Sequence, residues 1–252
     1  MLKVLLSLGL IIMFIAPLSA QDNVENEAKK LYNEGNAKRE AGDYQAAIAL
    51  YQQSIDKLPD YKSWYNMGLC YKNLNQTDKA VDCFEEALKL KTDFDLAYVQ
   101  IGAAYYAAEK YDSAIIHFEK VLEITTNNKV KNQATGALAN SYVKLSFNAY
   151  KGNKFQEAID NGLKAVAIEK NDYAYWYVAE SYLKLGDNAN AITNAKLALE
   201  NINKLSKGAV HFTLGTAYKN LGDKLNAVDN FTKASADANY KAAAEAEIKA
   251  MK

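Results

Sequence analysis

Arginine, histidine, cysteine and proline are scarce in this chain of 252 residues, and each scarcity excludes something. Arg39 is the single arginine, and 30 basic residues balance 30 acidic ones, so the formal net charge is +0. Without a basic block to follow phosphates or arginine forks to read base edges, nucleic acid is not an expected partner. With only two prolines and abundant Ala, Leu, Lys, Glu and Tyr, the composition favours helix throughout.

The two histidines give no sign of catalysis. His117 and His211 are isolated, with no second histidine at metal-ligand spacing, and no glycine-rich loop that could cradle phosphates is present. His211 stands where other parts of the chain place an aromatic residue, which favours a packing role, and His117 is expected to face solvent. We therefore expect no catalytic, cofactor-binding or metal-binding residues, and a protein that is not an enzyme.

Cys70 and Cys83 are the only thiols. They fall on consecutive predicted helices at similar height, but each is offset from the stripe that faces the other helix. An exported protein could oxidise them, so a disulfide and two free thiols both stay open at this point.

Residues 1–20 have the pattern of a signal peptide. Lys3 precedes an apolar run over 4–16, and Ala20 supplies the small residue before a polar stretch. The run is short for a membrane span, which needs about 20 apolar residues, so an uncleaved anchor is disfavoured. No cysteine lies near the predicted cut, which excludes a lipoprotein. We expect export to a bacterial periplasm or cell surface, a mature chain without a membrane span, and a short flexible N-terminus over 21–27.

The body of the chain repeats a fixed internal spacing. A small residue is followed 12 positions later by an alanine in five places, and the spacing between successive copies is close to constant. The small residues are Gly35, Gly68, Gly102, Ala179 and Gly215, and the alanines are Ala47, Ala80, Ala114, Ala191 and Ala227. Apolar residues around the small residue recur at i, i+3, i+4 and i+7, which indicates one face of a helix. The pattern predicts a stack of helical hairpins.

One copy carries the full pattern of aromatic, large apolar, small, aromatic, alanine, aromatic and alanine, in the residues Trp64, Met67, Gly68, Tyr71, Ala80, Phe84 and Ala87. This pattern resembles the tetratricopeptide repeat. The resemblance covers about residues 28–240 and implies an all-α, right-handed α-solenoid of about six helix-turn-helix repeats with a C-terminal capping helix. It also implies a binding scaffold, although the family serves many partners.

The expected organisation is three repeats over 28–126, three over 139–239 and a capping helix over 240–252. Residues 127–138 are extra, and they form either a linker or an extension of the following helix. We favour a long helix from Lys129 to Lys151 capped by Asn127 or Asn128, which would protrude and divide the array into two groups of three. The fourth repeat is the least regular, because Ser146 replaces the small residue and Gly162 replaces an aromatic.

A second stripe on the first helix of each hairpin is the candidate partner-binding surface. By resemblance the first helices line a concave groove, and most residues of this stripe are large and apolar or aromatic. The predicted groove residues are Tyr65, Leu69, Lys72, Tyr106, Phe147, Tyr150, Tyr173, Trp176, Glu180, Leu183, Phe212 and Lys219. Such a groove suits an extended or helical peptide.

The leading hypothesis is a non-enzymatic scaffold of the cell envelope that binds a peptide or protein segment in this groove. A glycan-binding module is one alternative, because aromatic faces stack on sugar rings, and a homo-oligomeric structural protein is another. Asn36 and Asn66 match the carboxylate clamp of cochaperones in this family, but Tyr32, Leu96 and Gln100 replace its basic residues. The clamp is therefore incomplete.

Overall fold

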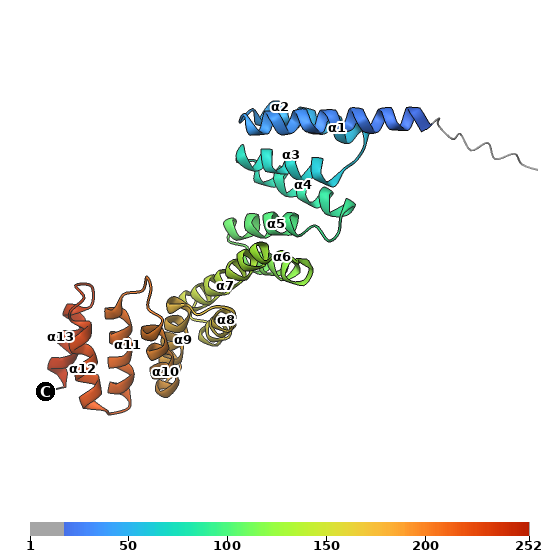
Figure 1. The fold of residues 1–252 in the computed structure, drawn as a ribbon. Coiled ribbons are helices and arrows are strands. Elements are labelled where there is room, and N and C mark those ends of the chain that lie inside the picture. Colours follow the sequence, from blue (N-terminus) through green and yellow to red (C-terminus); the bar gives the residue numbers. More distant parts are fainter. Residues whose placement is uncertain (1–17, 252) are drawn as a thin grey trace, which may run out of the picture. The chain divides into compact units, whose positions relative to one another are not determined.

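The computed structural model describes the backbone of residues 18–251 and the side chains of residues 21–251. Over this range the chain is helical, and the helices follow one another as antiparallel pairs (Figure 1). They are α1 (Leu18–Glu40), α2 (Tyr44–Lys57), α3 (Tyr61–Asn73), α4 (Thr77–Leu90), α5 (Asp95–Ala107), α6 (Tyr111–Ile124), α7 (Asn128–Lys151), α8 (Phe155–Ile168), α9 (Asp172–Lys184), α10 (Asn188–Glu200), α11 (Lys207–Asn220), α12 (Lys224–Ala234) and α13 (Lys241–Ala250). Six hairpins and a final helix confirm the predicted solenoid of helical repeats.

A glycine followed by an aspartate closes the turns of the fifth and sixth hairpins. Gly186 adopts φ +82°, a left-handed conformation that ends α9, and Asp187 then caps α10 by accepting from the backbone N–H of Asn190 at 3.1 Å. The turn between α11 and α12 repeats this arrangement with Gly222 and Asp223. Each turn is short because one residue reverses the chain and the next begins the second helix.

A glycine on the first helix packs against an aromatic ring on the second. A Cβ atom built on Gly68 would lie 2.6 Å from Cε1 of Phe84, and one on Gly102 would lie 2.8 Å from Cε1 of Phe118. In the fourth hairpin the glycine is on the second helix instead: a Cβ on Gly162 of α8 would lie 3.0 Å from Oγ of Ser146 on α7 and 2.4 Å from Cγ2 of Val178 on the following helix, α9. The irregular fourth repeat is thus a different solution to the same close approach of helices.

The chain separates into two compact units, Met1–Thr92 and Asp93–Lys252. Unit 1 contains α1 to α4, and unit 2 contains α5 to α13. The expectation of two groups of three repeats, divided at the extra residues 127–138, is therefore wrong: the boundary falls after the second hairpin.

Helix α7 is long, as predicted, and Asn127 caps it by accepting from the backbone N–H groups of Lys129 and Val130. Its first turns do not protrude. Val130 and Ala134 are buried in one cluster with residues of α5 and α6. The extension is amphipathic, and burial of this apolar face holds it against the preceding hairpin.

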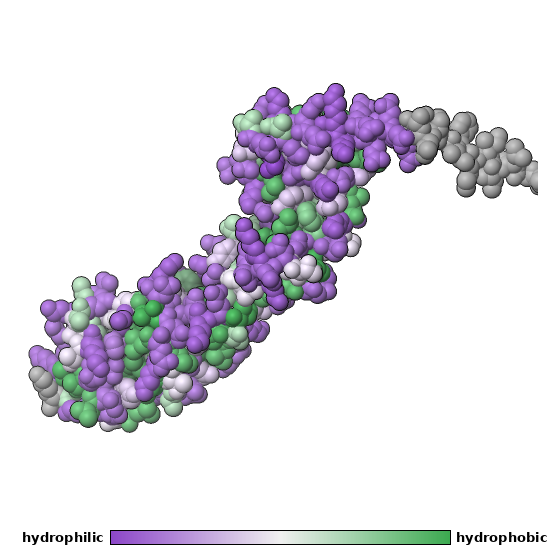
Figure 2. Space-filling model, viewed as in Figure 1, coloured by the Kyte–Doolittle hydropathy of each residue, from purple (hydrophilic) through white to green (hydrophobic). Residues whose placement is uncertain are grey.

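Residues 21–27, expected to be flexible, belong to α1 instead. The helix is held at this end because Ser54 Oγ of α2 donates to the carbonyl of Ala28 at 2.9 Å and Lys57 pairs with Glu27 at 3.0 Å. The exposed face of α1 is largely hydrophilic (Figure 2). Most of the predicted signal peptide, residues 1–17, lies outside the described residues. No helix within the described range has the length and hydropathy of a membrane span.

Candidate functional site

Five aromatic rings gather on α7 and α9 in unit 2, with Tyr177 at their centre. The centroid of the Tyr177 ring lies 5.3 Å from those of Phe147 and Trp176, and 6.1 Å from those of Tyr150 and Tyr173. All five side chains are partly exposed. Burial, and secondarily the nearby Tyr173, raises the pKa of Tyr177 to about 12, so its hydroxyl stays protonated at neutral pH. We call these five residues the aromatic cluster.

A polar network crosses the three first helices beside the aromatic cluster. Tyr150 on α7 donates to Oε2 of Glu180 on α9 at 3.0 Å, and Thr213 on α11 donates to Oε1 of the same carboxylate at 2.5 Å. Trp176 Nε1 donates to Oγ1 of Thr213 at 2.9 Å. Burial and then the Glu180 carboxylate raise the pKa of Tyr150. The network therefore connects the rings of Tyr150 and Trp176, which belong to two successive repeats, to Thr213 in a third repeat.

A cleft of about 590 Å³ adjoins this cluster. Helix α7 contributes one wall, the start of α9 contributes another, and the loops before α9 and α11 complete it. Its lining consists of Asn140, Val143, Lys144, Phe147, Glu169, Lys170, Asn171, Asp172, Tyr173, Tyr177, Asn203 and Lys204. The cleft thus combines three aromatic rings with three lysines and three asparagines.

Asp172 holds the loop before α11, which forms one wall of the cleft. It is 4% exposed, and its Oδ2 accepts from the backbone N–H groups of Asn203, Lys204 and Leu205 at 2.8 to 2.9 Å. Oδ1 accepts from its own neighbour Tyr173. Burial alone would raise the pKa of this carboxyl, but the four backbone donors together hold the pKa below its ordinary value. The loop before α11 is therefore held against the start of α9.

Several predicted groove residues of unit 2 have other contacts. Tyr106 packs edge-on against Tyr111 at its own hairpin turn, with centroids 5.3 Å apart. Phe212 packs against Phe231, and Lys219 pairs with Glu247 of α13 at 2.6 Å. Leu183 is half-buried in α9. Tyr106 and Phe212 therefore pack within their own hairpins, and Lys219 contacts the final helix, α13.

The predicted groove residues of unit 1 form a separate set. The ring of Tyr65 lies 5.5 Å from that of Phe84 within one hairpin, Leu69 is half-buried and Lys72 is exposed. The two asparagines of the incomplete clamp contact one another, because Asn66 Nδ2 donates to Oδ1 of Asn36 at 3.2 Å. That oxygen also accepts from the hydroxyl of Tyr51 at 2.8 Å.

Sequence reasoning missed Tyr177, Thr213 and Asp172. Tyr177 belongs to neither stripe of α9, so helical spacing gave no reason to select it. Thr213 is 1% exposed and was counted with neither stripe. Asp172 directly follows Asn171, a residue type that caps helices, and this pattern indicates the start of a helix, because the first turn favours acidic residues.

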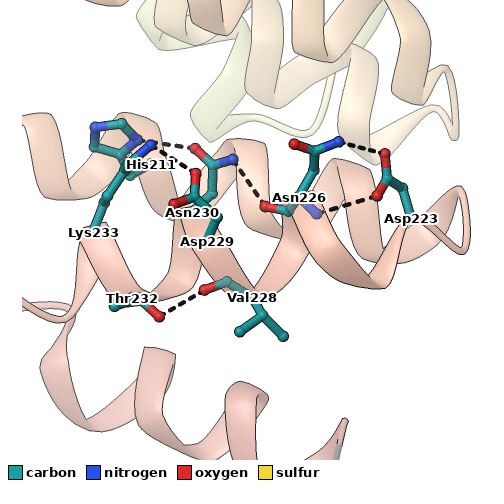
Figure 3. Close-up of polar contacts among 8 residues, drawn as sticks. All are labelled: His211, Asp223, Asn226, Val228, Asp229, Asn230, Thr232 and Lys233. Carbon is teal, nitrogen blue, oxygen red and sulfur yellow. Dashed lines mark hydrogen bonds and ion pairs between the residues drawn. The ribbon is translucent and has the colours of Figure 1, made fainter.

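The two histidines also have neighbours. Nδ1 of His211 lies 3.0 Å from Oδ1 of Asn230, which in turn is tied to the backbone of α12 (Figure 3). His117, expected to face solvent, is half-buried with its ring centroid 5.2 Å from that of Tyr105. The expectation is wrong because Tyr98 and Tyr105, on α5, pack against the His117 ring on α6. Among the described residues, no group of His, Cys, Asp and Glu is arranged to hold a metal ion.

Comparison with known families agrees with the repeat pattern. Tetratricopeptide repeat models match residues 31–61, 61–94, 95–128 and 209–236. The chain belongs to the tetratricopeptide repeat family. The remaining hairpins, including the irregular fourth, have the same helical arrangement in the structure.

The similar proteins come from different organisms and have different names. Small glutamine-rich tetratricopeptide repeat-containing protein 2 of Mycosarcoma maydis is 30% identical over 112 residues, which are 44% of this chain and 32% of that protein. BBSome complex member BBS4 of Bos taurus is 28% identical over 186 residues, 73% of this chain and 32% of that protein. The chain thus spans about a third of the length of these curated relatives. A tetratricopeptide repeat protein from Parabacteroides merdae, solved by crystallography, is 20% identical with a TM-score of 0.43, covering 92% of this chain and 91% of its own.

Proposed function

We propose that this protein is a non-enzymatic interaction scaffold that binds a peptide or protein segment on the aromatic cluster of unit 2. The observation that carries the proposal is the network from Tyr150 through Glu180 and Thr213 to Trp176. It holds large, partly exposed rings in fixed positions across three helices, which is the arrangement that gives contact area at little cost in conformational entropy.

Family membership supports a scaffold rather than a catalyst. Tetratricopeptide repeats are a fold with many partners, and one relative is named as a BBSome complex member. None of the matched family models is catalytic. We infer that this chain likewise acts by bringing proteins together.

The proposed location is the cell envelope. Its support is the sequence of residues 1–20, with a positive start, an apolar run and a small residue at the cut. The predicted cut after Ala20 falls within the first turn of α1. Fractionation of the native host, with the protein detected by antibody, tests this part: recovery from the cytoplasm at full precursor mass would contradict export.

The glycan-binding alternative is less well supported by the ring geometry. Sugars stack on open ring faces, whereas Tyr177 has four rings within 6.1 Å at tilted angles. The homo-oligomer alternative is tested by light scattering at high concentration, where a strict monomer would remove it.

The scaffold itself is tested by chemical crosslinking in the native envelope fraction followed by mass spectrometry. The Tyr150→Ala/Trp176→Ala double variant should lose the crosslinked partner that the wild-type protein retains. Ile116→Ala is the matched control, because Ile116 is 64% exposed on α6, outside the aromatic cluster. Circular dichroism establishes that both variants are folded. Equal capture by all three proteins would exclude the aromatic cluster as the binding site.

A further inference from the structure

We propose that the cleft beside the aromatic cluster selects the partner by charge, and that the bound segment is an acidic peptide. This inference rests on the proposed function, because it names the chemistry of the segment that the scaffold binds. Its evidence is the distribution of charge around the cleft.

Three lysines surround the cleft from three different elements. Lys144 lies on α7, Lys170 precedes α9 and Lys204 precedes α11. All three are exposed, and the ion pairs recorded among the described residues include none of them. Lys151 adds a fourth cation nearby, with Nζ 5.3 Å from the ring centroid of Phe147, which itself lines the cleft.

The acidic residues of the cleft do not balance these lysines. Asp172 is buried, and four backbone N–H groups already occupy its two oxygens. Glu169 is the one other carboxylate in the lining. The accessible charge of the cleft is therefore positive, although the whole chain is neutral.

The remaining lining fits a polypeptide. Asn140 and Asn203 are exposed in the lining, and their side-chain amides can pair with backbone N–H and C=O groups of an extended chain, whereas Oδ1 of Asn171 already caps α9. Tyr173 and Phe147 also line the cleft and offer apolar contact area to side chains between the acidic ones. An acidic peptide with interspersed apolar residues satisfies each of these groups, and charge complementarity would also speed its encounter.

The position of Lys204 is set by Asp172. The carboxylate accepts from the backbone N–H of Lys204 itself, at 2.8 Å, and from the residues on either side of it. The loop therefore presents this lysine at a defined place on the cleft wall. Asp172 is in this sense a positioning residue for the proposed site.

Fluorescence anisotropy of two labelled peptides tests the proposal. One is a short fluorescein-labelled peptide of Glu and Asp with two Phe residues, and the other replaces each Glu by Gln and each Asp by Asn. The protein is the full mature chain. We expect the acidic peptide to bind and the neutral one to bind about tenfold more weakly or worse, with affinity for the acidic peptide falling as salt is raised.

Two variants of equal charge locate the site. Lys144→Gln/Lys170→Gln/Lys204→Gln should weaken binding of the acidic peptide about tenfold. Lys224→Gln/Lys241→Gln/Lys249→Gln removes the same charge from exposed positions on α12 and α13 and should leave binding unchanged. Equal losses in both variants, equal binding of both peptides, or no binding of the acidic peptide would each overturn the proposal. Binding of polygalacturonate with no binding of the acidic peptide would overturn it in favour of an acidic glycan.

The two proposals can fail separately. If the native partner is lost from the Tyr150→Ala/Trp176→Ala variant but fully retained by the cleft-lysine variant, the scaffold stands and the acidic segment is wrong. If both variants retain it, the scaffold proposal itself fails at this site.

Discussion

The indole Nε1 of Trp176 on α9 donates to Oγ1 of Thr213 at 2.9 Å, and Thr213 is buried on α11. Thr213 Oγ1 in turn donates to Glu180. Replacing Thr213 by valine keeps the shape but leaves the indole donor and one carboxylate oxygen without this partner. We expect a loss of about 1–3 kcal/mol in the free energy of unfolding, measured by urea denaturation followed by the fluorescence of Trp64 and Trp176 together with circular dichroism.

Thr193→Val on α10 is the control for this substitution, because Thr193 is exposed and its hydroxyl donates only to the carbonyl of Ala189. Its effect should stay within about 0.5 kcal/mol. Equal stability of the two variants would show that the network does not join α9 to α11 in solution.

A second prediction concerns the glycine-to-ring contact in the hairpins. Alanine is a better helix former than glycine by about 1 kcal/mol, so Gly68→Ala should stabilise an isolated helix. In this protein the new Cβ would meet the buried Phe84 ring at 2.6 Å and the Ala80 carbonyl at 3.1 Å. We expect destabilisation of about 1–3 kcal/mol from overpacking, measured by thermal unfolding.

Gly136→Ala on α7 makes the same chemical change where there is space, since the nearest atom is Oε2 of Glu169 at 3.7 Å. It should stabilise the protein by about 0.5–1 kcal/mol. We thus predict that Gly68→Ala destabilises the protein and that Gly136→Ala stabilises it. Stabilisation by both substitutions would contradict close packing in the second hairpin.

A third prediction follows from the lowered pKa of Asp172. A depressed folded-state pKa stabilises the fold above the unfolded pKa of about 4, and this contribution is lost as pH falls through the folded value. The Asp172→Asn substitution places an amide N–H donor against backbone N–H donors. It should lower the free energy of unfolding by about 1–3 kcal/mol at pH 7. The difference in the free energy of unfolding between the wild type and the variant should become smaller as the pH falls below about 4. A gap that is independent of pH would show that the charge of Asp172 does not matter.

A fourth prediction concerns the thiols. Cys70 and Cys83 are free and buried, and burial raises their pKa values to about 11 and about 12. The thiolate is the reactive form, so the folded protein should react slowly with a thiol reagent at pH 8, and both thiols should react fully in denaturant. Intact mass should be the same with and without reductant, whereas a difference of two hydrogens would reveal a disulfide.

The repeat spacing was enough to predict the hairpins, because the small residue at Gly68 and the ring at Phe84 are both required for two helices to approach. The length of α7 could be predicted from Asn127 and the helical pattern after it. The site was harder. Trp176 and Tyr150 were selected by spacing, but Phe212 and Lys219 satisfied the same spacing and have partners in α12 or α13.

The remaining features depend on contacts between segments distant in sequence. The boundary after Thr92 and the packing of Val130 reflect which apolar faces meet, and spacing within one helix does not encode this. The role of Asp172 depends on a loop more than thirty residues away. A lysine such as Lys204 is an ordinary surface residue until that loop places it at the cleft.

The central claim, that unit 2 binds a protein segment at the aromatic cluster, is tested most directly by a photo-crosslinking amino acid. It is placed at Tyr173 in one protein and at Ile116 in another, and each protein is expressed in its native host and irradiated. The account predicts one defined polypeptide adduct from the Tyr173 position and none from the Ile116 position. Adducts of the same polypeptide from both positions, or from Ile116 alone, would contradict it.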